Sequence, residues 1–139
     1  MGDSTSILNL DFDGVIHSYK SGWQSAHVIP DPPVDGIEEW LYNAVRHFKI
    51  AVFSSRTGQE GGVSAMKGFV IGMLIRKFGV DEAQHIMERI YFPSSKPPAR
   101  VGIDDRVLQF NGDWKDDRYD PATLAQFQPW WMGVTHGSE

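Results

Sequence analysis

Residues 7–16 read ILNLDFDGVI, an apolar run that stops abruptly in two acids and a glycine. This pattern predicts a buried parallel strand that ends in a tight turn. Because side chains alternate along a strand, Asp11 and Asp13 leave on one side and Phe12 on the other. Two crowded carboxylates repel each other unless a cation sits between them. Asp also ends strands in an ordinary way, so this motif alone leaves both interpretations open.

The composition predicts one soluble, cytoplasmic domain spanning residues 1–139. The chain is 41% hydrophobic and 12% aromatic, which is enough to bury a core. Its net charge of −5 excludes a basic field for extended nucleic-acid binding, and the absence of cysteine excludes a disulfide framework or thiolate chemistry. The N-terminal letters lack a signal-peptide profile, and no apolar run is long enough for a membrane span.

Helical and strand patterns alternate along the rest of the chain. We expect strands at 49–53, 90–92 and 100–103, and helices at 35–48, 63–78, 81–89 and 120–128. Asp35 and Glu38 resemble a capping box at the first helix. The pair Asn111-Gly112 predicts a small β-hairpin over 107–114. A C-terminal helix and tail would occupy 120–139, with Trp130 and Trp131 docking that helix onto the body.

The polar segment 17–32 predicts a small flap or loop beside the two aspartates. Lys20, Trp23 and His27 could reach a bound substrate from this segment. A solvated loop with one anchoring tryptophan explains each of them equally well.

Alternation of strands and helices predicts a doubly wound, Rossmann-like α/β fold, a three-layer sandwich with a central parallel sheet. Ligands of such sheets bind at the carboxyl ends of the strands. Polar groups follow the expected strands at these ends, and Lys96 follows the strand at 90–92. The candidate site residues are Asp11, Asp13, Ser54, Ser55, Lys96, Asp104 and Asp105.

These residue types suit phosphoryl chemistry. Carboxylates from two strand ends favour a hard cation such as Mg²⁺, because every candidate ligand atom is an oxygen. The cation and Lys96 would neutralise phosphoryl oxygens, and Ser54 could donate to another of them. Asp11 could then attack phosphorus, while Asp13 would protonate the leaving group and later deprotonate water. Acting first as an acid and then as a base needs an Asp13 pKa raised toward neutrality, which crowding by other carboxylates could supply.

The four segments, in this order, resemble the haloacid dehalogenase-like (HAD) superfamily of phosphohydrolases. The letters DFDGVI match the first motif, FSSR the second, the lone Lys96 the third and VGIDDR the fourth. The resemblance covers about residues 7–110, and the stretch IDDRVLQFNGDW also looks like small capless members of phage and bacterial genomes. Segment 17–32 leaves no room for a full cap after the first strand.

The resemblance implies a role for each matched residue. Asp11 would be nucleophile and metal ligand, and Asp13 general acid/base with its backbone carbonyl on Mg²⁺. Ser54 would bind phosphate, with Ser55 the nearest competitor for that role. Lys96 would bind phosphate and orient Asp11. The acidic pair of the fourth motif, Asp104 and Asp105, would bind or support the metal.

The sequence therefore favours a Mg²⁺-dependent phosphatase acting on a phosphomonoester. The phosphorylated substrate could be a small molecule, a nucleotide, a phosphoprotein or a polynucleotide end, and the oligomeric state stays open. The alternative is a phospho-ligand-binding or regulatory module with little turnover. A receiver-like domain also combines acids, a hydroxyl and a lysine, but its phosphorylated aspartate ends a middle strand, where this chain has Ser54.

Overall fold

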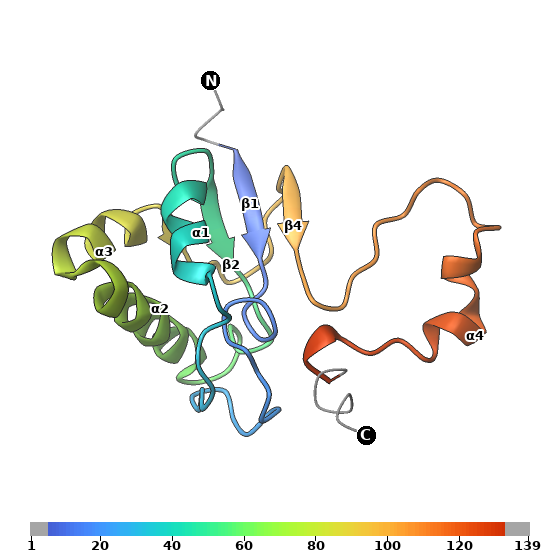
Figure 1. Ribbon diagram of the computed structural model, residues 1–139, viewed down its shortest axis with the longest axis horizontal. Coiled ribbons are helices and arrows are strands. Elements are labelled where there is room, and N and C mark those ends of the chain that lie inside the picture. The colour runs from blue at the N-terminus through green and yellow to red at the C-terminus, as the bar shows by residue number, and fades with distance from the viewer. Residues whose placement is uncertain (1–5, 133–139) are drawn as a thin grey trace.

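A four-stranded sheet with all strands parallel forms the centre of the protein (Figure 1). The computed structural model describes residues 6–132. The strands are β1 (Ile7–Leu10), β2 (Lys49–Val52), β3 (Ile90–Tyr91) and β4 (Val101–Ile103), and their order in the sheet is β3-β2-β1-β4. The predicted α/β class with a parallel sheet is confirmed.

The register of the sheet decides which side chains enter the core. Leu8 pairs with Ile50 and Leu10 pairs with Val52, so these rows point to the same face. Three helices cover that face: α1 (Ile37–Ala44), α2 (Gly62–Phe78) and α3 (Val80–Met87). Their buried residues join the strand residues in one core cluster: Ile37, Leu41, Ala44, Met66, Val70, Met73, Leu74, Ala83 and Ile86.

The expectation of helices on both faces of the sheet is not confirmed for the described residues. The opposite face carries Asn9, paired with Ala51 on one side and Gly102 on the other. The connection from β3 to β4 contains no helix, and the amide of Asn9 donates to the carbonyl of Pro97 within it at 2.9 Å. Prolines at 93, 97 and 98 explain this, because proline interrupts the backbone hydrogen bonds of a helix interior.

The start of α1 differs from the predicted capping box. The N-cap is Gly36, whose backbone is left-handed at φ 88°, and no side chain caps the helix. Asp35 lies one residue too early to cap, so the pairing with Glu38 does not form. The α2 prediction is confirmed to within one residue, with Gly79 closing the helix.

The predicted hairpin over 107–114 is also wrong. In the described chain no strand follows β4. Asn111 lies in an irregular segment instead: its side-chain oxygen accepts the backbone N–H of Asp113, and its amide donates to Asp116 Oδ2 at 2.9 Å. These local bonds replace the cross-strand bonds that a hairpin needs.

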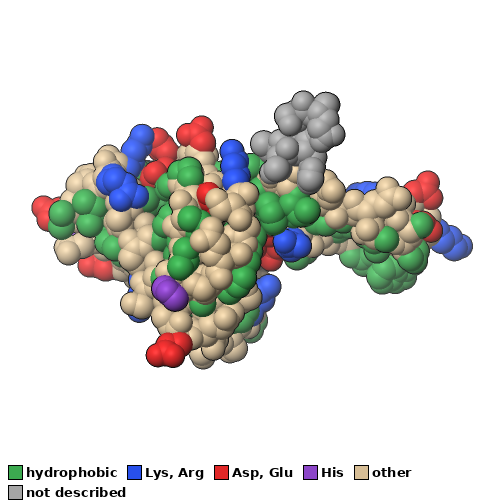
Figure 2. Space-filling model, turned by 90° about the horizontal axis from the view of Figure 1, so that it is seen from below, with side chains coloured by type: hydrophobic (Ala, Val, Ile, Leu, Met, Phe, Trp, Pro, Cys, Tyr) green, Lys and Arg blue, Asp and Glu red, His purple; other side chains and the backbone are tan. Residues whose placement is uncertain are grey.

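Residues 107–128 form what we name the C-terminal arm, which runs away from the sheet and then returns toward it (Figure 1). The arm contains a short 3-10 helix, η1 (Asp117–Tyr119), and α4 (Pro121–Leu124). Asp120 caps α4 and accepts the N–H of Ala122, and the helix is shorter than the predicted 120–128. Hydrophobic side chains gather on the projecting arm (Figure 2). The tail from residue 133 onward lies outside the described residues.

Candidate functional site

A polar pocket of about 460 Å³ opens where β1, β2 and β4 end. Its lining residues are Asp11, Asp13, Tyr19, Ser54, Ser55, Asp104, Asp105, Arg106 and Val107. Asp11 extends the sheet by one bond, because its N–H donates to the Ile103 carbonyl at 3.0 Å. The parallel sheet thus gathers six of the seven predicted site residues in one place.

Asp11, Asp104 and Asp105 form what we name the acidic cluster. Each offers one carboxylate oxygen within 4.8 Å of the others, and none of these residues makes a salt bridge with another described residue. Burial raises the pKa of Asp11 to about 8, helped by a hydrogen bond with Asp105 and by the charge of Asp104. Three half-buried oxygen donors without a cationic partner fit a hard divalent cation such as Mg²⁺.

Asp13 has a different environment from the acidic cluster. Both of its oxygens accept from Arg56, at 2.9 Å from Nε and 3.0 Å from Nη2. Its Oδ1 also lies 2.9 Å from His17 Nδ1. Burial raises the pKa of Asp13, but the hydrogen bonds from His17 and Arg56 lower it more, so the net pKa falls below its ordinary value. The expected raised pKa at Asp13 is therefore wrong.

His17 is fully buried, and its hydrogen bonds define one tautomer. The backbone N–H of Asp31 donates to His17 Nε2 at 3.0 Å, so Nε2 is the unprotonated nitrogen. The proton lies on Nδ1 and is donated to Asp13. His17 therefore orients Asp13 and is shielded from the pocket.

Ser54 and Ser55 both line the pocket but differ in exposure. Ser54 is buried, and its Oγ accepts the backbone N–H of Arg56 at 3.0 Å. Its hydroxyl proton remains able to donate to a ligand oxygen. Ser55 is exposed in the same turn.

Lys96 lines a neighbouring pocket of about 190 Å³ that shares Asp11, Asp104 and Val107 with the polar pocket. Its side chain is exposed, and it makes no salt bridge among the described residues. The bond from Asn9 to Pro97 fixes the loop that carries Lys96. Lys96 therefore lies beside the acidic cluster, on the face of the sheet opposite the helices.

The segment 17–32 is anchored by Arg56. This fully buried guanidinium donates from Nη1 to three of the segment's carbonyls, those of Ser25, Ala26 and Val28, at 2.9 to 3.1 Å. The Trp23 ring lies 4.9 Å from Arg56. Trp23, Lys20 and His27 do not line either pocket, whereas Tyr19 lines the polar pocket.

Two tryptophans from the end of the described chain also reach the site. Trp131 Nε1–H donates to Asp105 Oδ2 at 2.6 Å, and Trp130 Nε1–H donates to the Gly14 carbonyl at 2.7 Å. The prediction that these residues dock the C-terminal region onto the body agrees with these bonds.

The site residues predicted from the sequence do not include Arg56 or His17, the two side chains that hold Asp13. The four-residue spacing of Asp13 and His17 across a glycine turn was a usable signal, because it allows the chain to fold back on the carboxylate. The partnership of Trp131 with Asp105, 26 residues apart, has no comparable signal.

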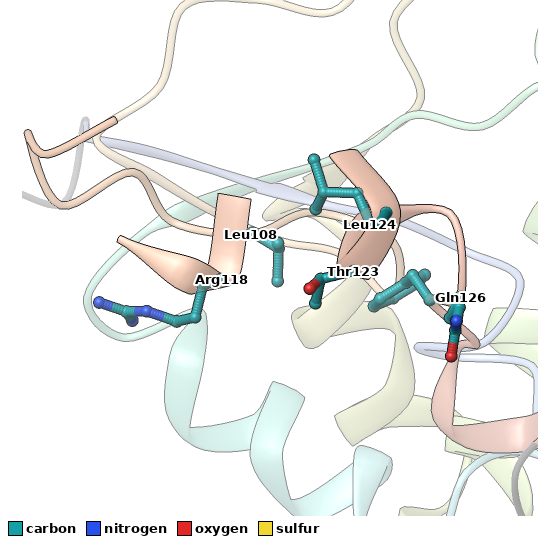
Figure 3. Close-up of a pocket in the computed structure, with 7 residues that line it drawn as sticks. Leu108, Arg118, Thr123, Leu124 and Gln126 are labelled. Atoms are coloured by element: carbon teal, nitrogen blue, oxygen red, sulfur yellow. The ribbon is translucent and has the colours of Figure 1, made fainter. Parts of the chain in front are cut away.

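A further pocket, of about 520 Å³, lies on the C-terminal arm (Figure 3). It is bordered mostly by apolar side chains, including Leu108 and Leu124, and contains none of the predicted site residues. Its one arginine, Arg118, is paired with Asp116 at 2.9 Å. This groove offers no arrangement for acid–base or phosphoryl chemistry.

Comparisons with protein families, curated proteins and solved structures find no match to this chain. Among the described residues, no helix has the length and apolar character needed to cross a membrane. The candidate function therefore depends on the geometry of the polar pocket.

Proposed function

We propose that this protein is a Mg²⁺-dependent phosphohydrolase of the HAD-like type, which cleaves a phosphomonoester through an aspartyl-phosphate. The observation that carries the proposal is the convergence of the acidic cluster with Ser54 in one pocket and with Lys96 beside it. Oxygen donors, a hydroxyl and an ammonium together match what a phosphoryl group and a hard cation require.

Asp11, Asp104 and Asp105 would hold the cation, together with the backbone carbonyl of Asp13. A bound Mg²⁺ would neutralise charge on the phosphoryl oxygens and favour the ionised form of Asp11. Ser54 and Lys96 would bind the remaining phosphoryl oxygens, with Ser55 at the exposed side of the same turn.

In the first step, an Asp11 oxygen bonds to phosphorus and the bond from phosphorus to the leaving oxygen breaks. The leaving oxygen keeps the electron pair and takes a proton from solvent. In the second step, water attacks the phosphorus of the aspartyl-phosphate and gives one proton to Asp13, while the bond from phosphorus to Asp11 breaks. Inorganic phosphate leaves, Asp11 is regenerated, and Asp13 passes its proton to solvent. Because its pKa is lowered, Asp13 is ionised at neutral pH and is therefore in the form that can accept a proton in this second step.

The test is turnover of p-nitrophenyl phosphate with Mg²⁺ and with excess EDTA. We expect activity only with the metal, and a loss of about a thousandfold or more in Asp11→Asn. Asp81→Asn, an exposed carboxylate in α3, is the matched control and should retain activity. Metal-independent turnover, or full activity in Asp11→Asn, would reject the proposal.

One observation favours the alternative of a phospho-ligand-binding module with little turnover. Arg56 and His17 occupy the carboxylate of Asp13, which limits its ability to deliver a proton to a leaving group. Such a module would bind Mg²⁺ and inorganic phosphate but release no p-nitrophenol, in the wild type or in Asp11→Asn.

A further inference from the structure

The chain leaves the acidic cluster at one point and returns to it at another. After Asp104 and Asp105 it runs out through the C-terminal arm, and at Trp130 and Trp131 it is back beside the turn that follows β1 (Figure 1). Trp131 is only 8% exposed, although the arm before it is largely exposed. The described chain therefore ends against the candidate site.

Trp131 contacts the site on several sides. Its indole N–H donates to Asp105 Oδ2 at 2.6 Å. The ring centroid of Tyr19 lies 4.8 Å from that of Trp131, edge to face, and the Arg106 guanidinium lies 5.4 Å from the ring. Tyr19 and Arg106 both line the polar pocket, so Trp131 packs against two of the residues that form it.

Close packing around Gly14 leaves the Asp105 carboxylate little freedom. A Cβ on Gly14 would overlap Asp105 Oδ2 and would lie 2.9 Å from Trp131 Nε1. Trp130 adds a second anchor through its bond to the Gly14 carbonyl at 2.7 Å. The turn after β1, the residues that follow β4 and the tryptophans that follow the arm thus meet at the carboxylate of Asp105.

An indole N–H can only donate, so it matches an ionised carboxylate and fixes its orientation. Partners that orient metal-binding side chains in this way commonly contribute tenfold to a hundredfold to metal affinity, to order of magnitude. We propose that Trp131 is a positioning residue whose N–H orients Asp105 toward a divalent cation, so that the C-terminal segment completes the metal site. This inference rests on the proposed function.

The experiment is isothermal titration of the full-length protein with Mg²⁺ alone, without substrate. Trp131→Phe keeps an aromatic ring and removes the N–H, and Trp114→Phe, at an exposed position on the arm, is the matched control. We expect the dissociation constant for Mg²⁺ to rise about tenfold or more in Trp131→Phe and to change less than about twofold in Trp114→Phe. Circular dichroism checks that both variants are folded.

A second readout uses the wild type and so does not depend on the folding of a variant. In a ¹⁵N–¹H spectrum, Mg²⁺ should shift the indole signal of Trp131 and leave that of Trp114 in place, and Asp105→Asn should also shift the Trp131 signal. Normal Mg²⁺ binding with a stationary Trp131 signal, or with unchanged affinity in Trp131→Phe, overturns the inference and leaves the proposed function intact. A wild type that binds no Mg²⁺ overturns both.

Discussion

Gly14 lies where any side chain would collide with the acidic cluster. Its φ is +84°, in the left-handed region, and an added Cβ would overlap the Asp105 carboxylate. Gly22 has a similar φ of +75° but open space around it. The two glycines therefore separate the effect of backbone strain from the effect of collision.

We predict that Gly14→Ala destabilises the protein more than Gly22→Ala does. Backbone strain alone should cost about 1 to 2 kcal/mol at either position. Collision with Asp105 should add to this at Gly14 and should weaken Mg²⁺ binding there. Urea unfolding and Mg²⁺ titration of both variants check the prediction, and equal losses of stability would show that the neighbours of Gly14 move aside.

The raised pKa of Asp11 predicts an unusual dependence of stability on pH. With a folded pKa of about 8 against an ordinary value near 3.8, the folded state binds one proton more than the unfolded state between these pH values. Without metal, the contribution of Asp11 to the free energy of unfolding should therefore fall as pH rises from about 4 to about 8.

Added Mg²⁺ competes with that proton, so it should raise the melting temperature more at pH 8 than at pH 5.5. Thermal unfolding at both pH values, with Mg²⁺ and with EDTA, measures the difference. Asp11→Asn is the control, since it removes the titrating group and should flatten the pH dependence. A gain from Mg²⁺ that is equal at both pH values would contradict the assignment of Asp11.

At the scale of elements, Arg56 joins the turn after β2 to Asp13 and to the segment 17–32. Removing one partner of a buried ion pair leaves an uncompensated charge, which costs about 3 to 5 kcal/mol. We predict a loss of this size for Arg56→Met, together with faster amide exchange throughout 17–32. Arg118→Met, which breaks an exposed Arg–Asp pair on the arm, should change stability little. Unchanged exchange in 17–32 would show that the segment is held by other contacts.

The elements marked by uninterrupted or periodic apolar residues were predictable, and those decided by the local backbone and polar side-chain bonds were not. The strands and α2 follow directly from uninterrupted or periodic hydrophobic residues. The hairpin failed because Asn111 bonds to Asp113 and Asp116, which pattern reasoning does not weigh against strand pairing. The start of α1 failed because the left-handed Gly36 took the capping position from Asp35.

In the candidate site, too, some features could be predicted from the sequence and others could not. Topology alone brings the ends of β1, β2 and β4 together, so the positions of Asp11, Ser54 and Asp104 could be anticipated from strand ends. The partners of Asp13 and Asp105 come from a flap and from the end of the described chain, and no strand register places them. Sequence therefore predicted where the carboxylates gather and missed what orients them.

At the scale of the whole molecule, the C-terminal arm contrasts with the core. Many of its apolar side chains are exposed, among them Leu108, Leu124 and Phe127, whereas Leu41 and Ile50 are fully buried. Segments with few buried contacts open locally at small free-energy cost. We predict that limited chymotrypsin digestion cuts first within 107–128, which mass spectrometry of the fragments would identify.

A matched pair of variants tests the same contrast thermodynamically. Leu41→Ala should cost about 2 to 5 kcal/mol, because it leaves a cavity in the core. Phe127→Ala removes a larger side chain but should cost much less. Early cleavage within α2, or a comparable loss in Phe127→Ala, would show that the arm is as firmly packed as the core.

The hydrogen bond between Trp131 and Asp105 closes the intervening chain into a long loop, whose two ends both lie beside the polar pocket. The entropic free energy of closing such a loop grows slowly with its length, by only about 0.6 kcal/mol for each doubling. The middle of the loop could therefore be extended, shortened or exchanged while its two ends keep their places. The segment between Asp105 and Trp131 is therefore a place where the length of the chain can change while both of its ends stay beside the polar pocket.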